Sequence, residues 1–159
     1  MFPALPLRPM LLTKNSLTLI LGALFTLCTL SENAAAQNPV NWLPEQLMKP
    51  EVLAQALQAD KDVPLIINIG PAALIPRSVD VGAVQNKEGR EKLATALKGV
   101  EKNAAVVVYC GCCPYEHCPN VRPAIELLKT SGFTNYKLLD LPRNIKADWL
   151  DKGYPRNKL

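Results

Sequence analysis

The run AAVVVY at positions 104–109 constrains the fold of this chain more than any other segment. Six consecutive apolar and aromatic residues do not alternate with polar ones, as they would in a strand with one face exposed to solvent. They therefore predict a strand buried on both faces. The run VPLIINI at 63–69, ended by Gly70 and Pro71, predicts a second strand of this kind. Residues 136–141 predict a third. Strands buried on both faces are typical of a parallel sheet.

The segments between these runs have helical spacing. Residues 88–97 place apolar side chains on one face, and a second apolar face begins at Val121 and ends before Gly132, a residue suited to a helix stop. Weaker patterns predict helical turns within 44–57 that are interrupted at Pro50, a short strand within 78–84 and a closing helix at 147–151. The alternation predicts the α/β fold class, a single domain whose parallel sheet has helices on both faces.

The amino-terminal segment has the three parts of a secretory signal peptide. Arg8 and Lys14 lie in a stretch without acids, residues 15–31 carry no charge, and small residues end at Ala36. The apolar run is shorter than the roughly 20 residues that a membrane-spanning helix needs. We expect cleavage after Ala36 and a periplasmic or extracellular protein. The predicted division is a signal peptide at 1–36, a linker at 37–43 and a domain at 44–159.

Charge and composition exclude some partners. Without residues 1–36 the chain has 123 residues, with 16 basic against 13 acidic side chains spread along it. A mild excess without a charged block predicts neither a nucleic-acid partner nor, after cleavage, a membrane partner. We expect a monomer without a cofactor.

The cysteines of the mature chain lie within nine residues, at Cys110, Cys112, Cys113 and Cys118. Disulfide scaffolds spread their cysteines so that each bridge closes a long loop, which disfavours a structural framework here. Cys110 directly follows a predicted strand, and a helix follows the loop. The free N–H groups and the positive dipole end of that helix stabilise a thiolate. The pattern therefore predicts a nucleophilic cysteine at this end of the sheet.

The segment VVVYC, a loop and an Arg-initiated helix ending in SGF resemble the active-site region of the rhodanese family. The segments PEVLAQALQADKDVPLIINIG, VDVGAV, YKLLDL and ADWLDKGYP resemble other parts of that family, so that the resemblance covers about residues 44–155. The loop CGCCPYEHCPNVRPA is similar to an exported branch of rhodanese-like proteins. The resemblance implies a parallel sheet and transfer of a sulfane sulfur through a cysteine persulfide, commonly from thiosulfate.

Position by position, the resemblance implies that Cys110 forms the persulfide and that Arg122 binds the anionic substrate. Cys118 is the candidate second catalytic thiol, and Cys112 and Cys113 are accessory thiols. The expected partners are a small sulfur-containing substrate or an acceptor thiol protein. The chain departs from the family in a loop of 13 residues from cysteine to arginine instead of six, and in having Asn68-Ile69-Gly70 where Asp-x-Arg is typical.

Three alternatives stay open at this point. Four thiols with His117 supply the ligand types of a copper or zinc site, whose ligands would be Cys110, Cys112, Cys113, Cys118 and His117. Clustered thiols in an oxidising compartment also suit thiol–disulfide exchange, with a labile bridge to Cys118. The third alternative is a rhodanese-like binding module without catalysis.

Overall fold

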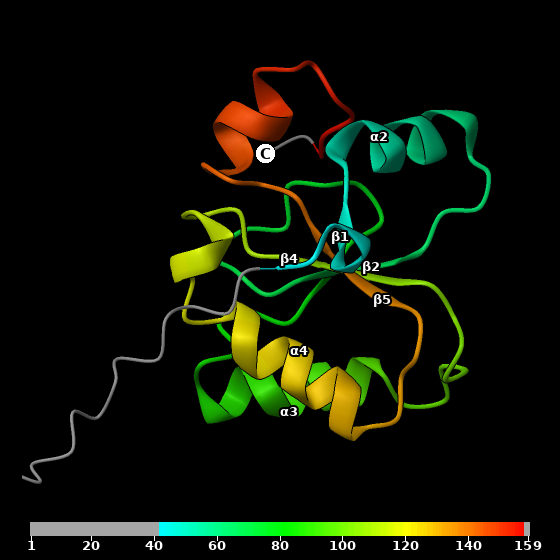
Figure 1. Cartoon of the computed structure of the whole chain (residues 1–159), viewed down its shortest axis with the longest axis vertical. Helices are drawn as coiled ribbons and strands as arrows, with labels where there is room; N and C mark the ends of the chain where they lie inside the picture. Colours follow the sequence, from blue (N-terminus) through cyan, green and yellow to red (C-terminus); the bar gives the residue numbers. More distant parts are fainter. Residues whose placement is uncertain (1–41, 158–159) are drawn as a thin grey trace, which may run out of the picture. The chain divides into compact units, whose positions relative to one another are not determined.

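The computed structural model describes residues 42–157 (Figure 1). The predicted signal peptide at 1–36 and most of the linker at 37–43 lie outside the described residues. Within 42–157, none of the helices combines the length and the apolar character needed to cross a bilayer.

Five parallel strands form one sheet with the order β1-β5-β4-β2-β3. The strands are β1 (Leu47–Met48), β2 (Leu65–Asn68), β3 (Val79–Asp80), β4 (Val106–Tyr109) and β5 (Tyr136–Leu139). The central strand is β4, in which Val107 lies opposite Ile66 of β2 and opposite Lys137 of β5. Because all strands are parallel, their carboxyl ends meet at one edge of the sheet.

Helices cover both faces of this sheet. The elements are α2 (Pro50–Ala59), α3 (Lys87–Ala96), α4 (Val121–Thr130) and the short π-helix η3 (Lys146–Leu150). In Figure 1, α2 and the orange-red η3 lie above the sheet, and α3 and α4 lie below it. The predicted fold class, an α/β domain whose parallel sheet has helices on both faces, is confirmed.

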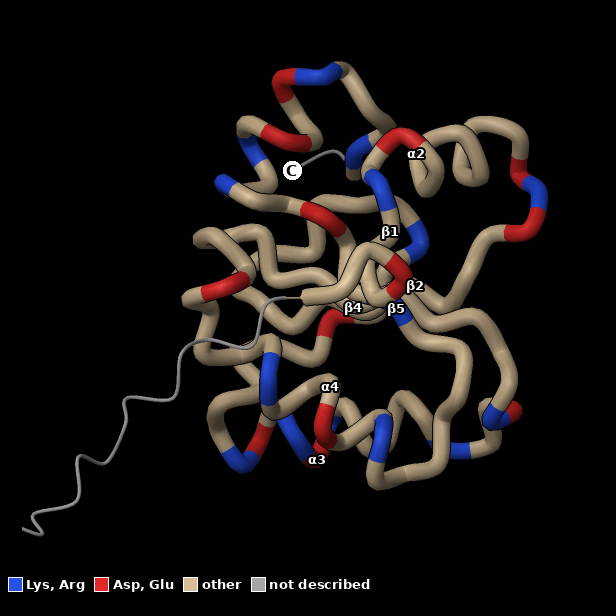
Figure 2. The backbone as a smooth tube through the Cα atoms, in the orientation of Figure 1, with Lys and Arg blue, Asp and Glu red and all other residues tan. Residues whose placement is uncertain are grey.

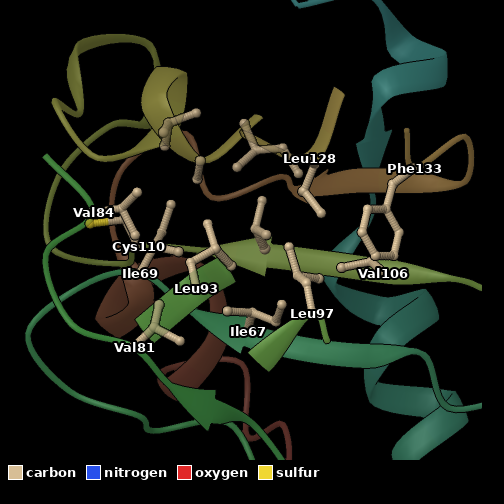
Figure 3. Close-up of a cluster of buried hydrophobic side chains, with 14 of the residues drawn as sticks. Ile67, Ile69, Val81, Val84, Leu93, Leu97, Val106, Cys110, Leu128 and Phe133 are labelled. Carbon is tan, nitrogen blue, oxygen red and sulfur yellow. The ribbon is translucent and has the colours of Figure 1, made fainter. Parts of the chain in front are cut away.

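The strands divide their side chains between two hydrophobic clusters. Val106 and Val108 of β4 pack with the α3 and α4 side chains, including Leu93 and Leu128 (Figure 3). Val107 points to the opposite face, whose cluster contains Leu53 of α2 and Trp149 of η3. Successive strand residues face opposite ways, so a strand covered on both faces must be apolar throughout. This is the physical reason for the run at 104–109.

One predicted element is wrong. Helical turns are expected within 44–57, but Leu47 and Met48 form the edge strand β1, opposite Leu138 and Leu139 of β5. The helix α2 begins only at Pro50, where a missing N–H costs nothing because the first turn has no intrahelical acceptor for it. The other predicted strands and helices are confirmed, with ends that shift by one to two residues. The short 3-10 turn η1 (Pro44–Gln46) lies within the segment predicted to form helical turns, whereas the 3-10 turn η2 (Tyr115–His117) was not predicted.

Basic and acidic residues alternate along the described backbone without a long block of one sign (Figure 2). On α3, Lys87 pairs with Glu91 and Lys92 pairs with Glu88, each one helical turn away. Because these side chains are exposed to solvent, the pairs contribute little to stability. The expectation that the protein has no nucleic-acid partner stays a prediction.

Candidate functional site

The segment from Cys110 to Asn120 connects the central strand β4 to α4, and we call it the cysteine loop. It contains the single 3-10 turn η2, closed by hydrogen bonds from the His117 N–H to the Pro114 carbonyl (3.1 Å) and from the Cys118 N–H to the Tyr115 carbonyl (3.3 Å). This turn folds the insertion back over the end of β4. As a result, Cys118 lies close to Cys110, and their Sγ atoms are within 4.8 Å of each other.

A glycine fixes the direction in which the loop leaves β4. Gly111 has a φ of 77°, a conformation that L side chains rarely adopt. Its carbonyl accepts a hydrogen bond from the Ile145 N–H at 2.8 Å. A Cβ at this glycine would lie 2.8 Å from the Ile145 Cβ. The backbone after Cys110 is therefore held against the segment that enters η3.

A second glycine packs against the nucleophile candidate from the neighbouring strand. A Cβ at Gly70 would lie 2.2 Å from the Cys110 carbonyl oxygen and 3.0 Å from its Sγ. The buried Asn68 side chain holds this glycine: its Oδ1 accepts from the Gly70 N–H (3.2 Å), and its Nδ2 donates to the Gly70 carbonyl (3.0 Å). Nδ2 also donates to Asp80 Oδ1 at 2.9 Å. Asn68 therefore holds Gly70 in a position where its backbone lies close to the backbone and the sulfur of Cys110.

Three sulfur atoms form the centre of the site. The Sγ atoms of Cys110, Cys112 and Cys118 all lie within 4.8 Å of one another, and the first two are 3.2 Å apart. Cys110 and Cys118 are buried, whereas Cys112 is exposed. All four cysteines of the loop are free thiols. The Sγ of Cys113 lies 3.4 Å from the Sγ of Cys112 but outside the group of three. The exposed His117 also lies outside this group.

The three sulfurs differ in their affinity for a proton. The pKa of Cys110 is lowered to about 5, chiefly because the Cys118 thiol donates a hydrogen bond to it, while burial opposes the shift. The Cys112 backbone and side chain and the Asn120 side chain lower it further. Burial, with the Cys110 sulfur beside it, raises the pKa of Cys112 to about 12. Donation to Cys110 is the main cause of the raised pKa of Cys118. These shifts favour one thiolate in the cluster, on Cys110, with Cys112 and Cys118 remaining protonated near neutral pH.

The predicted anion-binding residue lies at the start of α4. Arg122 is the second residue of that helix and is exposed. None of the ion pairs between residues 42 and 157 involves its guanidinium. The side chain is thus available at the helix end that faces the loop, and its role in binding substrate stays a prediction.

The sequence reasoning missed Asn120, the residue before α4. It is buried, and its Nδ2 lies 3.6 Å from Cys110 Sγ. Its Oδ1 accepts a hydrogen bond from the Gln85 N–H at 3.0 Å. An asparagine before a helix is usually an N-cap, so its residue type and position give no sign of a contact with the sulfur. Gly70 and Asn68 were noticed only as departures from a family pattern.

Together these contacts define an α/β domain with a thiolate at the carboxyl end of its central strand. No protein-family profile and no curated protein matches the chain. Among solved structures, the Alr3790 protein from Anabaena sp. is similar with a TM-score of 0.51 and 18% identity, over 70% of this chain and 92% of that one. This similarity shows a shared fold.

A second solved structure is SseA from Escherichia coli, described in terms of the "rhodanese" fold and the catalytic mechanism of 3-mercaptopyruvate sulfotransferases. It is similar with a TM-score of 0.44 and 22% identity, over 63% of this chain and 41% of that one.

Proposed function

We propose that this chain is a rhodanese-like sulfurtransferase that carries sulfane sulfur as a persulfide on Cys110. The observation that supports this most is the thiolate-favouring environment of Cys110 at the end of β4, where the Cys118 thiol and the Asn120 amide face its sulfur. A nucleophilic cysteine needs a lowered pKa and a fixed position. The contacts of Gly70 and Gly111 with their neighbours supply the fixed position.

The proposed reaction has two steps. The Cys110 thiolate attacks the outer sulfur of thiosulfate, forming a new S–S bond, while the S–S bond of thiosulfate breaks and sulfite leaves with its electron pair. An acceptor thiolate then attacks the outer sulfur of the persulfide, and the electron pair of the broken bond restores the Cys110 thiolate. A low pKa helps the second step, because a weakly basic thiolate is a good leaving group.

We assign Cys118 to the second step and Arg122 to the first. The Cys118 thiol contacts Cys110 from the buried side, so that after loading it is positioned to help release the sulfur. Arg122 supplies a positive charge for the anionic donor. The exposed Cys112 and the half-buried Cys113 serve as accessory thiols near the surface.

Mass analysis after incubation with thiosulfate tests this function. We expect the wild type to gain one sulfur atom and Cys110→Ser to gain none. Cys118→Ser should load, because a serine hydroxyl still donates a hydrogen bond to the thiolate, but it should release sulfur to an added thiol more slowly. Arg122→Ala should load at higher thiosulfate concentrations only.

Cys113→Ser is the matched control, since this thiol lies outside the group of three, and it should load normally. A loaded Cys110→Ser together with an inert Cys118→Ser would transfer the nucleophile's role to Cys118. A wild type that loads from no common sulfane donor would overturn the proposed function.

One observation favours a second candidate, a site for a soft metal ion. Three Sγ atoms within 4.8 Å of one another suit copper(I), which prefers thiolate ligands, or zinc with a further ligand. The ligands would be Cys110, Cys112 and Cys118. An ion bound tightly and stoichiometrically to anaerobically purified protein, without any sulfur loading, would favour this candidate over the first.

We further propose that the protein works outside the cytoplasm, periplasmic or extracellular, as a monomer. The support is the sequence pattern of residues 1–36 and the interspersed charges along the described backbone. Its partners would be a small sulfur compound or an acceptor thiol protein, and neither nucleic acid nor, after signal cleavage, a membrane.

A further inference from the structure

Asn120 is a buried polar residue at the junction of the cysteine loop and α4. Only 5% of it is exposed. A buried amide without hydrogen-bond partners is destabilising, so the partners that Asn120 has are informative. Asn120 has two side-chain contacts, with Gln85 from the segment between β3 and α3 and with Cys110 at the end of β4.

The position of Asn120 predicts a different bond from those observed. An asparagine at the N-cap of a helix normally accepts a hydrogen bond from an N–H of the first turn. Asn120 is the N-cap residue of α4 and makes no such bond. The helix therefore lacks a stabilising capping interaction, and the side chain points across the loop instead.

The contact with Gln85 orients the amide. A backbone N–H can only donate, so the atom of Asn120 that it meets at 3.0 Å must be the oxygen. The amide nitrogen consequently faces Cys110 Sγ, at 3.6 Å. Gln85 follows Val84, which lies at the Cys110 end of the cluster in Figure 3. The backbone of Gln85 thus orients the Asn120 amide so that its N–H group faces the Cys110 sulfur.

An amide differs from the other donors around Cys110. Cys112 and Cys118 are thiols, which lose their protons or form new S–S bonds when they take part in transfer. The amide keeps its N–H groups at every pH in which the protein is folded and in every redox state of the loop. Hydrogen bonds to a charged group are also stronger than those between neutral groups.

We propose that Asn120 is a catalytic hydrogen-bond donor that holds Cys110 as a thiolate and then stabilises the negative charge of its persulfide. The second half of this role rests on the proposed function, whereas the first half requires only the thiolate.

The substitution Asn120→Asp tests the role directly. It conserves size and the acceptor for the Gln85 N–H, but it replaces the donor beside the sulfur with a carboxylate oxygen. A like charge beside the thiolate raises the pKa of Cys110. We expect the midpoint of Cys110 alkylation against pH to rise by about one unit or more, which is a tenfold change in the thiolate equilibrium. Alkylation at Cys110 is followed by fragment mass spectrometry, without any sulfur donor.

Asn135→Asp is the matched control. It adds the same charge to an exposed asparagine at the amino end of β5, where the side chain contacts only the Asn103 carbonyl, and it should leave the midpoint unchanged. Asn120→Ala removes the donor without adding charge, so it should raise the midpoint by less than Asn120→Asp. Thermal melts of all variants establish that they are folded.

Two results decide the matter. A folded Asn120→Asp or Asn120→Ala protein with the wild-type midpoint would overturn the inference. A raised midpoint in both variants supports the thiolate role even if the wild type never loads sulfur, a result that would overturn the proposed function alone. A raised midpoint with loading from thiosulfate slowed about tenfold supports both halves.

Discussion

Cys110 and Cys118 are almost equally buried, with exposed fractions of 5% and 4%, yet the pKa of Cys110 is lowered and that of Cys118 is raised. Burial alone disfavours a thiolate at either position. The difference comes from hydrogen-bond direction: Cys118 donates to Cys110, and the Cys112 N–H and Asn120 add donors to the same sulfur. One negative charge is thereby concentrated on the residue that the sheet fixes most rigidly.

The pH dependence of Cys110 reactivity follows from this arrangement. Since its pKa is lowered to about 5, alkylation by iodoacetamide should stay fast down to mildly acidic pH. It should be lost as the pH falls through that value, because the sulfur then becomes protonated. An ordinary cysteine loses reactivity near pH 8.5. The measurement is the rate of Cys110 alkylation between pH 4 and pH 9. Urea-denatured protein is the control and should show the ordinary midpoint; the same midpoint in folded protein would contradict the prediction.

At this scale the sequence predicted the position of Cys110 at the end of the central strand but not its surroundings. That position could be predicted because Cys110 directly follows a strong strand pattern, whereas its role as the nucleophile stays a prediction. The role of Asn120 depends on Gln85 and Cys110 being brought together, two residues separated by α3 and β4. Local patterns contain no information about such a contact. Local patterns are equally silent about Asn68, whose side chain hydrogen-bonds to Gly70 and to Asp80 of the neighbouring strand β3.

At the scale of elements, the wrong prediction at β1 has a similar cause. Leu47 and Met48 are good residues for a helix or a strand, and nearby apolar residues gave them helical spacing. Their strand exists because β5, about ninety residues later in the chain, offers an open edge to pair with. The central strands β2 and β4 were predicted correctly because strands buried on both faces consist almost entirely of apolar residues, a pattern that is visible in each segment alone.

The pairing of β2 with β4 positions the nucleophile, and Gly70 tests this. In Gly70→Ala the new Cβ would overlap the Cys110 carbonyl oxygen, so the backbone at one of the two strand ends must shift. We expect a loss of about 1–3 kcal/mol in the free energy of unfolding, as for an overpacked core. Displacement of Cys110 from its donors should also raise its pKa. Urea unfolding and the alkylation profile measure the two effects.

Leu128→Ala separates these two effects. Leu128 is fully buried in the hydrophobic cluster that also contains Cys110. The cavity left by the substitution should lower the free energy of unfolding by about 2–5 kcal/mol. Leu128 lies near the carboxyl end of α4, however, and so away from the cysteine loop. The alkylation midpoint of this control should equal that of the wild type. If both variants moved the midpoint equally, general destabilisation rather than the β2–β4 contact would explain the change at Gly70.

At the scale of the whole molecule, the site and the core are continuous. Cys110 and Cys118 belong to the hydrophobic cluster that joins α3 and α4 to the sheet, and Cys113 and Tyr115 of the loop pack against it. The buried sulfurs are therefore part of the packing that stabilises the domain. The loop is held by these core contacts and by the hydrogen bond from the Ile145 N–H to the Gly111 carbonyl.

The whole molecule also bears on export, the last prediction. All strands, helices and core residues described lie between 42 and 157, so cleavage after Ala36 removes none of them. We expect the full chain, expressed in a bacterium with a secretory pathway, to yield a protein outside the cytoplasm that begins within a residue or two of Gln37. Amino-terminal sequencing of each cell fraction measures this.

A matched variant makes that experiment decisive. Signal peptidases require small residues before the cut, so Ala34→Lys with Ala36→Lys should leave the chain uncut and attached to the membrane fraction. Both substitutions lie outside the folded region described, so a difference between the two proteins reports on processing and not on stability. An intact Met1 in the membrane fraction of the unaltered chain would overturn the proposed export as a free protein, and the thiol chemistry of the cysteine loop would then have to operate at a membrane surface.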